Sequence, residues 1–210
     1  IMIFAIAAVS LVVAVWLWAP TDYSAFRSLT LAAFNVTSLI TTTRFVHGDY
    51  SSWGTFPVVL FFLLCFVGGC SGSTSGSIKV FRWELFFSGL RRLAISNFQP
   101  NRVIPLFYNG QRVTPETIFS VFSFLLLFIV TFAVLSLIAA LLGADFVTAT
   151  SGIAAMMSNS GPGLGEIIGP AGTYKPLSDP LKWLFSLAML LGRVELLTVL
   201  VLLFPDFWRT

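Results

Sequence analysis

The sequence predicts an all-α integral membrane protein made of two helix–pore loop–helix repeats, and three observations support this prediction. Apolar residues make up 57% of the 210 residues and charged residues only 10%, whereas soluble domains are normally about 25% charged. Two long runs, 1–19 and 117–142, contain no charged residue. The same order of apolar helix, short polar helix and polar turn also occurs twice, at a separation of about 117 residues.

The uncharged runs are the candidate membrane-spanning helices. At about 1.5 Å of rise per residue, the run 117–142 reaches roughly 39 Å and can cross a bilayer. The run 1–19 has the length of a signal-peptide core but lacks a basic segment before it, so we interpret it as a spanning helix at a cut end or behind an upstream region. Shorter apolar stretches at 53–67 and 183–204 predict two further membrane helices. The alternative, an unusually apolar soluble core, does not explain such long uncharged runs.

Each repeat places a short helix and a polar turn between two apolar helices. The opening helices are expected over 1–19 and 115–142, and the short helices over roughly 24–40 and 146–158. The short helices cannot cross a bilayer, because spanning takes about 20 apolar residues. They end in the sequences Thr41-Thr42-Thr43-Arg44-Phe45 and Asn159-Ser160-Gly161-Pro162-Gly163. An apolar helix then leads back across the membrane.

Polar turns of this composition at membrane depth predict a path for a cation. Non-helical backbone is tolerated inside a bilayer only where protein buries it or where it lines a water-filled cavity. Turns of Thr, Ser, Asn and Gly can point carbonyl and hydroxyl oxygens at a dehydrated cation and replace its water shell. Each short helix also directs its C-terminal end, which carries roughly −0.5 charge, toward its turn. An ordinary Thr- and Gly-rich loop is the alternative interpretation.

A third irregular segment, 68–77, interrupts the apolar stretch that begins near Trp53. It contains only Gly, Ser, Thr and Cys, and it starts about 15 residues after Trp53, sooner than the roughly 20 residues that a span needs. The break therefore falls inside the bilayer, and we expect a flexible gate. A simple helix kink and the unwound binding segment of a transporter are the alternatives. A nucleotide-phosphate cradle is not expected, because the Gly-Lys-[Ser/Thr] ending is missing.

The charged residues orient the chain. Six of its 12 basic residues lie between 78 and 115, against one acid, Glu84. Short basic connections stay cytoplasmic, so this stretch is expected to face the cytosol. An acid-leaning outer side, which would concentrate cations, is then formed by Asp22, Asp49, Asp145, Glu166 and Asp179.

Other polar residues give little sign of catalysis. His, Cys and carboxylate residues do not cluster with catalytic spacing, so the chain is not expected to be an enzyme. Cys65 and Cys70 lie in apolar surroundings and are interpreted as packing residues, and His47 as an outer-mouth residue. In the final helix, Arg193 and Glu195 interrupt an apolar run. Such charges face a cavity or a partner, and a structural salt bridge to another helix is the alternative.

These residues resemble the Trk/Ktr/HKT superfamily, and most closely units three and four, the C-terminal half, of the TrkH-type subunit of bacterial potassium uptake. The resemblance covers essentially the whole chain. The stretches that carry it are Phe34-Asn35-Val36-Thr37-Ser38 through Thr41-Thr42-Thr43, the segment from Gly68 to Lys79, Asn159-Ser160-Gly161-Pro162-Gly163-Leu164-Gly165, and Gly192-Arg193-Val194-Glu195 with Phe207-Trp208-Arg209.

The resemblance implies half of a pseudo-fourfold, K⁺ channel-like pore that the remaining two pore units of the same protein complete. The implied K⁺ ligands are Thr42, Thr43, Asn159, Ser160 and Gly161. The implied gate consists of Gly68, Gly69, Ser71, Gly72 and Gly76, with Arg193 beneath the filter. Implied surroundings are a homodimer, a cytosolic nucleotide-binding regulatory ring, and the lipid of a bacterial cytoplasmic (inner) membrane. K⁺ is the transported ion, and neither a covalently bound cofactor nor a nucleic-acid partner is expected.

One residue departs from the family pattern. The third turn of the family has a glycine after its threonines, whereas this sequence has Arg44; the fourth turn keeps its glycine, Gly161. A permanently charged guanidinium at that position is expected to plug or weaken the pore. The alternative is that Arg44 turns outward and pairs with Asp49 or another acid.

We therefore expect three segments: a third pore unit over 1–77 with its gating loop at 68–77, a cytosolic basic connection over 78–114, and a fourth pore unit over 115–210. The expected function is K⁺ uptake across the cytoplasmic membrane by a channel-like subunit. A secondary transporter with broken helices, which couples a substrate to a co-ion, is the alternative. A purely structural membrane subunit is a third possibility.

Overall fold

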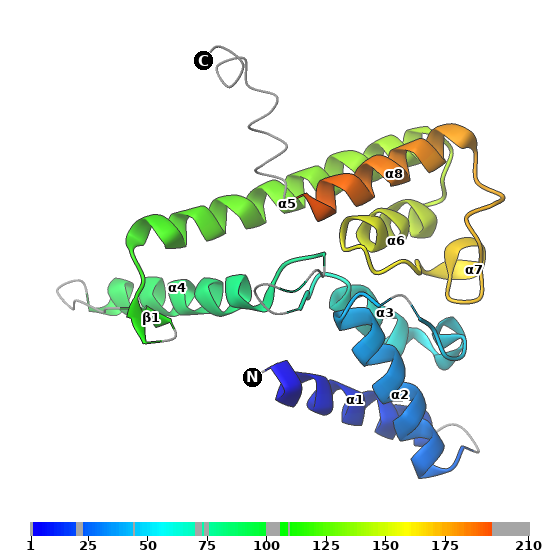
Figure 1. The fold of residues 1–210 in the computed structure, drawn as a ribbon, viewed down its shortest axis with the longest axis horizontal. Coiled ribbons are helices and arrows are strands. Elements are labelled where there is room, and N and C mark those ends of the chain that lie inside the picture. Colours follow the sequence, from blue (N-terminus) through cyan, green and yellow to red (C-terminus); the bar gives the residue numbers. More distant parts are fainter. Residues whose placement is uncertain are drawn as a thin grey trace.

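The computed structural model describes residues 2–19, 23–43, 45–69, 73, 76–99, 106–108 and 110–194. These residues are mostly helical (Figure 1). The elements in chain order are α1 (Met2–Trp18), α2 (Ala25–Ile40), the 3-10 helix η1 (Tyr50–Trp53), α3 (Thr55–Leu64), α4 (Val80–Phe98), β1 (Phe107–Tyr108), β2 (Gln111–Arg112), α5 (Pro115–Leu141), α6 (Phe146–Met157), α7 (Gly165–Ile168) and α8 (Asp179–Arg193). The two strands pair as a small antiparallel hairpin between α4 and α5.

The helices differ in their capacity to span a membrane. Within the described residues, α5 alone is long and apolar enough by both length and composition, with 27 residues and a mean hydropathy of 2.9. The apolar helix α1 has 17 residues, and α2, α3 and α6 are shorter. The predicted apolar helix at 53–67 forms as α3, which stops at Leu64. The described part of the stretch 183–204 lies in α8, and residues 195–204 are outside the described residues.

The first half of the chain packs around the contact between α1 and α2. Val13 and Leu17, one turn apart on α1, are buried together with Ala32 and Val36, one turn apart on α2. This spacing puts each pair on one helix face. Phe61 of α3 completes the cluster, so α3 is tied to the same core that positions α2.

The second half packs α5, α6 and α8 around a separate core, and Figure 1 shows α8 lying along α5 with α6 beside them. Leu135 and Ala139 of α5 meet Ile153 of α6 and Phe185 of α8 in this core. Gly152 lets α6 and α8 approach closely, because a Cβ at this position would lie 2.7 Å from the Phe185 ring. The short helix α6 is therefore held on two sides by longer ones.

The basic stretch expected as a connection is largely helical. Residues 80–98 form α4, which packs against α5 with Leu85 and Gly89 buried. Phe81, Leu85 and Gly89 recur every four residues, which is the spacing of one helix face. The sequence analysis did not predict this helix, because arginines between the apolar residues mask the spacing.

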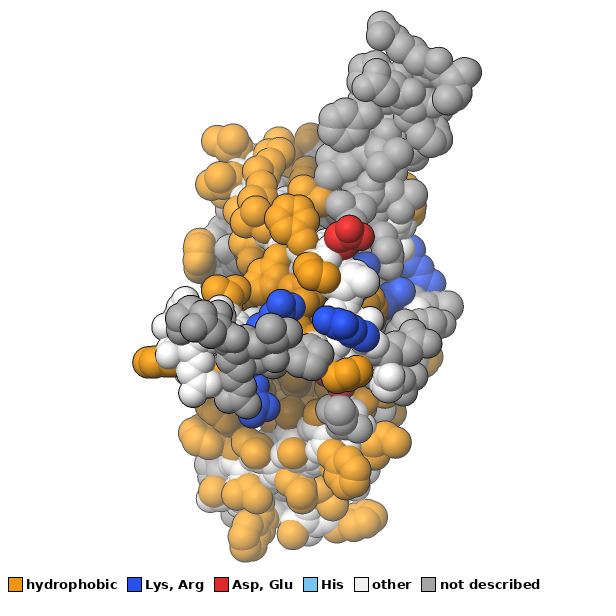
Figure 2. Space-filling view, turned by 90° about the vertical axis from the view of Figure 1, so that its left-hand side faces the viewer, with side chains coloured by type: hydrophobic (Ala, Val, Ile, Leu, Met, Phe, Trp, Pro, Cys, Tyr) orange, Lys and Arg blue, Asp and Glu red, His pale blue; other side chains and the backbone are white. Residues whose placement is uncertain are grey.

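The surface separates apolar sides from a basic end. Large apolar side chains on α1 and α5 are exposed, for example Phe4 at 81%, Leu126 at 65% and Leu141 at 86%. Figure 2 views the end at which α4 stops and α5 starts, where Lys and Arg side chains lie across the middle with apolar side chains above and below. Soluble monomers rarely expose apolar surface on this scale, so the pattern is typical of a protein whose sides face lipid.

Candidate functional site: the two polar turns

Helices α2 and α6 end in turns with the same hydrogen bonds. In the first turn the N–H to carbonyl pairs are Thr41 to Thr37, Thr42 to Leu39 and Thr43 to Ser38, at 2.9, 3.1 and 3.0 Å. In the second they are Ser158 to Ala154, Asn159 to Met156 and Ser160 to Ala155, at 2.9, 3.0 and 3.0 Å. Every pair lies 117 residues after its counterpart, as from 41 to 158. The repeat inferred from the sequence therefore extends to individual backbone bonds.

Both turns are Schellman motifs with an unusual residue at their left-handed position. Glycine is usual there, yet Thr42 has φ of 54° and Asn159 has φ of 56°. Asparagine tolerates this region, whereas a β-branched threonine is a genuine outlier in it. A residue held in this region costs about 1–3 kcal/mol and tends to mark a functional site.

The hydroxyl groups of the two turns also match. The Oγ1 atoms of Thr41 and Thr43 lie 2.6 Å apart, and the Ser158 hydroxyl donates to the Ser160 hydroxyl at 2.9 Å. These bonds orient the hydroxyl protons within each turn, and the backbone carbonyls supply further oxygens. No described residue donates a hydrogen bond to the carbonyl of Thr42, Thr43 or Ser160. With the negative ends of α2 and α6 behind them, these oxygens can bind a cation.

A buried polar side chain fixes the segment that follows each turn. Asn35 of α2 donates to the His47 carbonyl at 2.7 Å and accepts from the His47 N–H at 3.0 Å. Ser151 of α6 accepts from the Leu164 N–H at 3.0 Å, and its hydroxyl donates to the Val147 carbonyl at 2.6 Å, with the Leu164 carbonyl further away at 3.4 Å. His47 and Leu164 are again 117 residues apart. In both halves one side chain satisfies the backbone of the corresponding residue, which sets the position of the chain beyond the turn.

Helix α8 covers the second turn. The Asn159 side chain donates to the Met189 carbonyl of α8 at 3.1 Å, so its amide holds α8 in place. One turn further along α8, Gly192 comes so close that an added Cβ would lie 1.8 Å from the Met157 carbonyl oxygen. Only glycine permits this approach. Ser158, Asn159 and Ser160 are consequently buried, with exposures of 0%, 4% and 1%.

Tyr174 holds the glycine of the second turn. Gly161 has φ of 95°, and its carbonyl accepts a hydrogen bond of 2.6 Å from the Tyr174 hydroxyl. Burial raises the pKa of Tyr174 well above its ordinary value, so the hydroxyl keeps its proton and remains a donor. The Tyr174 ring packs edge-on against Phe185 of α8. Tyr174, which lies in the loop between α7 and α8, thus ties the carbonyl of Gly161 to α8.

The two ends of the segment predicted as a gate are joined to each other by backbone hydrogen bonds, and we call this paired region the neck. Val67 and Ile78 form a bridge, the Gly68 N–H donates to the Ile78 carbonyl at 2.9 Å, and the Val80 N–H donates to the Gly69 carbonyl at 3.2 Å. Gly76 lies against the second turn, since an added Cβ there would be 2.5 Å from the Ser158 carbonyl oxygen. The neck and the second turn are therefore in direct contact.

Cys65 links the end of α3 to both structures. Its carbonyl accepts from the Ser77 hydroxyl at 2.8 Å, and its sulfur accepts from the Ser160 hydroxyl at 3.6 Å. The prediction that Cys65 is a packing residue agrees with its burial at 8% exposure.

The remaining predicted site residues fall into two groups. Arg193 is the last residue of α8 and is exposed, next to the close approach at Gly192. Outside the described residues lie Arg44, Ser71 and Gly72 of the predicted site, together with Cys70, Asp22 and Glu195.

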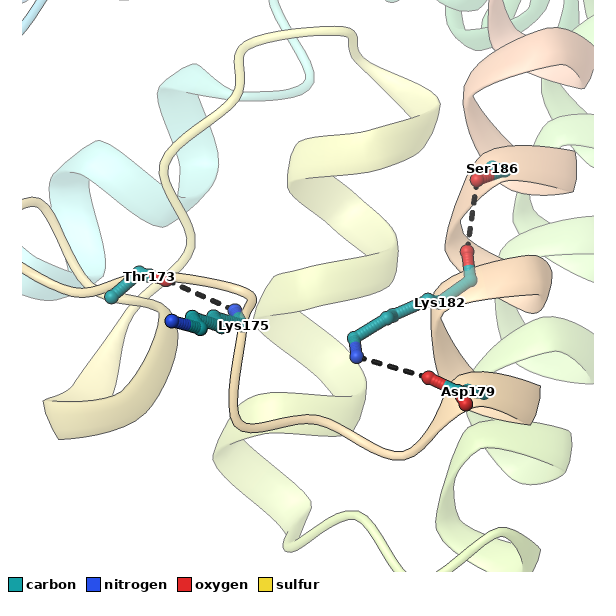
Figure 3. Close-up of polar contacts among 5 residues, drawn as sticks. All are labelled: Thr173, Lys175, Asp179, Lys182 and Ser186. Atoms are coloured by element: carbon teal, nitrogen blue, oxygen red, sulfur yellow. Dashed lines mark hydrogen bonds and ion pairs between the residues drawn. The ribbon is translucent and has the colours of Figure 1, made fainter.

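The loop before α8 carries charges that were expected at an outer mouth. Figure 3 shows Lys182 reaching back along α8 to Asp179, with Nζ 3.1 Å from the carboxylate oxygen. Lys175 lies in the preceding loop, where its N–H donates to the Thr173 hydroxyl at 3.0 Å. The positive charge of Lys182 therefore partly offsets the negative charge of Asp179. Asp179 contributes less to an acidic outer surface than the sequence suggested.

Sequence reasoning missed the residues that support the turns: Asn35, Ser151, Tyr174 and Met189. Asn35 and Ser151 are polar residues on short helices that face a core, which is a usable signal, because a buried amide or hydroxyl needs a partner. Tyr174 and Met189 contact the turn only through tertiary packing, and no local pattern marks them.

Comparison with known proteins decides the family. The TrkH cation transport protein family matches residues 2–209. The chain belongs to this family. The potassium uptake protein TrkI of the Trk system of Halomonas elongata is 50% identical over 185 residues, covering 88% of this chain and 38% of that protein. The Trk system potassium uptake protein TrkH of Escherichia coli is 35% identical over 195 residues, covering 92% and 40%.

A solved structure supports the membership in this family. The crystal structure of the potassium transporter TrkH from Vibrio parahaemolyticus matches with a TM-score of 0.90 and 32% identity, over 99% of this chain and 44% of that one. The chain thus spans about two fifths of the length of these TrkH-family relatives. The family expected from the residues is confirmed.

Proposed function

We propose that this chain supplies part of the pore of a channel-like K⁺ uptake protein. The observation that carries the proposal is the duplicated turn, in which backbone bonds and left-handed residues recur at 117 residues. A duplicated oxygen-rich turn at a helix C-terminus suits a site shared by several similar units around one ion. The Trk system potassium uptake proteins among the relatives support K⁺ as that ion.

The proposed ligands are backbone oxygens of the turns rather than their side chains. Thr42 and Thr43 would contribute carbonyls from the first turn, and Asn159, Ser160 and Gly161 would form the second. The Asn159 amide is engaged with α8 and the Ser160 hydroxyl with Ser158 and Cys65, so these side chains would hold the turn while carbonyls replace the water of K⁺.

In this proposal residues 1–77 and 115–210 are the third and fourth pore units, and two further units of the same protein complete a pseudo-fourfold ring. The exposure of Thr41 and Thr43 fits a turn that meets another unit. The basic end that includes α4 would face the cytosol of a bacterium, where a nucleotide-binding regulatory ring would dock. A homodimer is part of the same proposal, as is a location in the cytoplasmic membrane.

The segment 68–77 is the proposed gate. Its neck touches the carbonyl of Ser158 through Gly76, so a movement of the segment would reach the second turn directly. Arg193 ends the helix that packs on the same turn, and its guanidinium would hold the gate closed and repel cations. Arg193→Ala should then raise resting flux, whereas Arg193→Lys, which keeps the charge, should not.

The proposal is tested by Rb⁺ uptake into liposomes that hold the complete protein. Gly161→Ala places a side chain at φ of 95° in the second turn and should lower uptake at least tenfold. Gly143→Ala is the matched control, because Gly143 has φ of 90° with nothing within 4 Å of an added Cβ. Equal effects of the two substitutions would reject an ion site at the turn.

The same assay separates the channel-like protein from a transporter. A transporter with broken helices predicts uptake that saturates and requires a co-ion, with the segment 68–77 as the binding site. A channel-like pore predicts uptake that follows the K⁺ gradient without a co-ion. Residues 1–210 alone should give no flux, because two turns leave the ring incomplete.

A further inference from the structure

Two neighbouring hollows lie beside the contact between α4 and α5. The larger is lined by α3, the segment after it, the first half of α4 and the middle of α5, and the smaller by the end of α4 and the start of α5. The larger, about 570 Å³, is lined only by apolar and aromatic side chains, among them Trp83, Leu125 and Ile129. Its volume is within the range of about 300–1,000 Å³ that is typical of ligand sites. Phe86 lines the larger hollow and Phe122 the smaller, and their rings are in contact with centroids 5.0 Å apart, so the two hollows are neighbours.

The smaller hollow, about 280 Å³, lies between the end of α4 and the start of α5 and is partly polar. Its lining includes Arg92, Ser96 and the apolar Leu93. Arg92 is half-buried, and no hydrogen bond or ion pair joins its guanidinium to another described residue. A guanidinium without a carboxylate partner can bind an anion through charge-assisted hydrogen bonds, which makes this hollow suited to an anion.

The neighbouring arginines on α4 are placed differently. Arg82 stacks over the Phe124 ring at 3.8 Å, and Arg91 is exposed and lines neither hollow. Other Lys and Arg side chains lie across the middle of this end of the molecule (Figure 2). They can attract anionic surfaces in general, whereas among the described basic residues Arg92 lines the smaller hollow.

The geometry points to one anionic phospholipid as the occupant of the two hollows. Its phosphate would lie at Arg92 and Ser96, and one acyl chain would pass Phe86 and Phe122 into the apolar hollow beside Trp83. The pairing of a half-buried guanidinium in one hollow with a purely apolar hollow next to it matches a lipid, which joins an anion to a hydrocarbon chain. This site is independent of ion passage and of the two polar turns.

The test uses the purified chain in detergent and lipids with brominated acyl chains, which quench nearby tryptophan fluorescence. Phosphatidylglycerol should quench at lower concentration than phosphatidylcholine. Because a charge-assisted hydrogen bond contributes roughly tenfold to binding, Arg92→Ala should raise the half-quenching concentration of phosphatidylglycerol about tenfold. It should leave phosphatidylcholine unchanged, and Arg92→Lys should largely restore the preference.

Two further variants locate the lipid. Arg91→Ala removes the same charge from the adjacent residue and should shift phosphatidylglycerol by twofold or less, as expected for general attraction. Trp83→Phe should remove the part of the quenching that depends on Arg92. Equal shifts for Arg91→Ala and Arg92→Ala, an Arg92-dependent quenching that survives Trp83→Phe, or displacement of the lipid by millimolar inorganic phosphate would each overturn the assignment.

Discussion

The two polar turns have the same internal hydrogen bonds but different surroundings. Ser158 and Ser160 of the second turn are buried beneath α8 and the neck of the segment 68–77, whereas Thr41 and Thr43 of the first turn are exposed. The backbone geometry of each turn is therefore produced locally, by the end of its short helix. The support of each turn comes from tertiary contacts, which only the second turn receives from the described part of this chain.

The two turns differ most at the residue that follows each of them. Arg44 stands 117 residues before Gly161, which has φ of 95°. If the first turn provides a K⁺ site, a fixed cation about 4 Å away opposes K⁺ by roughly 4 kcal/mol at an effective dielectric near 20. We expect Arg44→Gly to raise Rb⁺ uptake by the complete protein by up to about a thousandfold.

Three variants separate the contributions at this position. Arg44→Gln removes the charge with little change in size and should recover most of the uptake if charge dominates. Arg44→Lys keeps the charge and should recover little. The reciprocal substitution Gly161→Arg should abolish uptake. Equal uptake by the unmodified protein and by the Arg44→Gly variant, over a range of salt, would contradict the block and favour an arginine that turns outward.

The contact between α8 and the second turn should be the most sensitive packing contact. In Gly192→Ala the new Cβ would meet backbone atoms of Met157, which cannot move aside. Overpacking of this kind costs about 1–3 kcal/mol or more, so we expect the unfolding midpoint in detergent to fall by roughly 5–10 °C.

Gly89→Ala is the matched control for this loss. It makes the same change in a helix, but the added Cβ would meet ring and methyl carbons of Phe122 and Ile118 at 3.1 and 3.3 Å. Side chains can shift by a few tenths of an ångström, and alanine is a better helix former than glycine. The midpoint should change by about 2 °C or less; an equal loss for both variants would show that α8 is not specifically locked to the turn.

The buried side chains behind the turns allow a direct comparison of the two halves. Asn35→Ala would leave the N–H and carbonyl of His47 without their partners, at about 1–3 kcal/mol. Ser151→Ala leaves only the Leu164 N–H without its partner, because the Ser151 hydroxyl donates mainly to the Val147 carbonyl within its own helix, and Tyr174 and α8 still support the second turn. We therefore expect Asn35→Ala to lower the free energy of unfolding about twice as much.

Amide hydrogen exchange locates this effect. The His47 N–H should lose protection in Asn35→Ala, and the Leu164 N–H should lose less in Ser151→Ala. Thr150→Ala is the control, because its exposed hydroxyl bonds only to the Phe146 carbonyl within its own helix. A larger loss at Leu164 than at His47 would mean that the first turn is the better supported of the two.

These contrasts show how far the sequence could predict the fold. The boundaries expected for the short helices, roughly 24–40 and 146–158, agree with α2 and α6 within a few residues, because apolar periodicity and a polar ending are local signals. The separation of 117 residues between the two polar turns was visible for the same reason. Helix α4 was missed, since its apolar face is interrupted by arginines that the helix can accommodate on its other sides.

The two polar turns were predictable in position, but their supporting contacts were not. Hydroxyl and glycine residues indicated where the turns lie, and Asn159 is a residue that tolerates a left-handed conformation. Nothing local marked Thr42 for the same conformation, because a β-branched residue disfavours it. The close approach of Gly192 to Met157 depends on how α6 and α8 pack, which sequence periodicity alone does not specify.

The smallest expected difference between the halves concerns the starts of the short helices. Ser24 caps α2 by accepting from the Arg27 N–H at 3.3 Å, and Asp145 caps α6 by accepting from the Thr148 N–H at 3.2 Å. Replacement of either by Ala should cost about 1 kcal/mol. Only the second cap can titrate, and its hydrogen bonds with Thr148 lower the pKa of Asp145 below the ordinary 3.8.

A lowered pKa fixes the sign of the pH dependence. The stabilisation from ionised Asp145 is fully present above its unfolded pKa and is lost as the pH falls through the lower folded value. The midpoint difference between the unmodified chain and Asp145→Asn should therefore be constant from pH 7 to about pH 5 and shrink progressively as the pH falls below the ordinary 3.8. The difference caused by Ser24→Ala should stay constant over the whole range, because a hydroxyl cap carries no charge. A pH-dependent effect of Ser24→Ala, or a pH-independent one of Asp145→Asn, would show that the charge of Asp145 does not act through the start of α6.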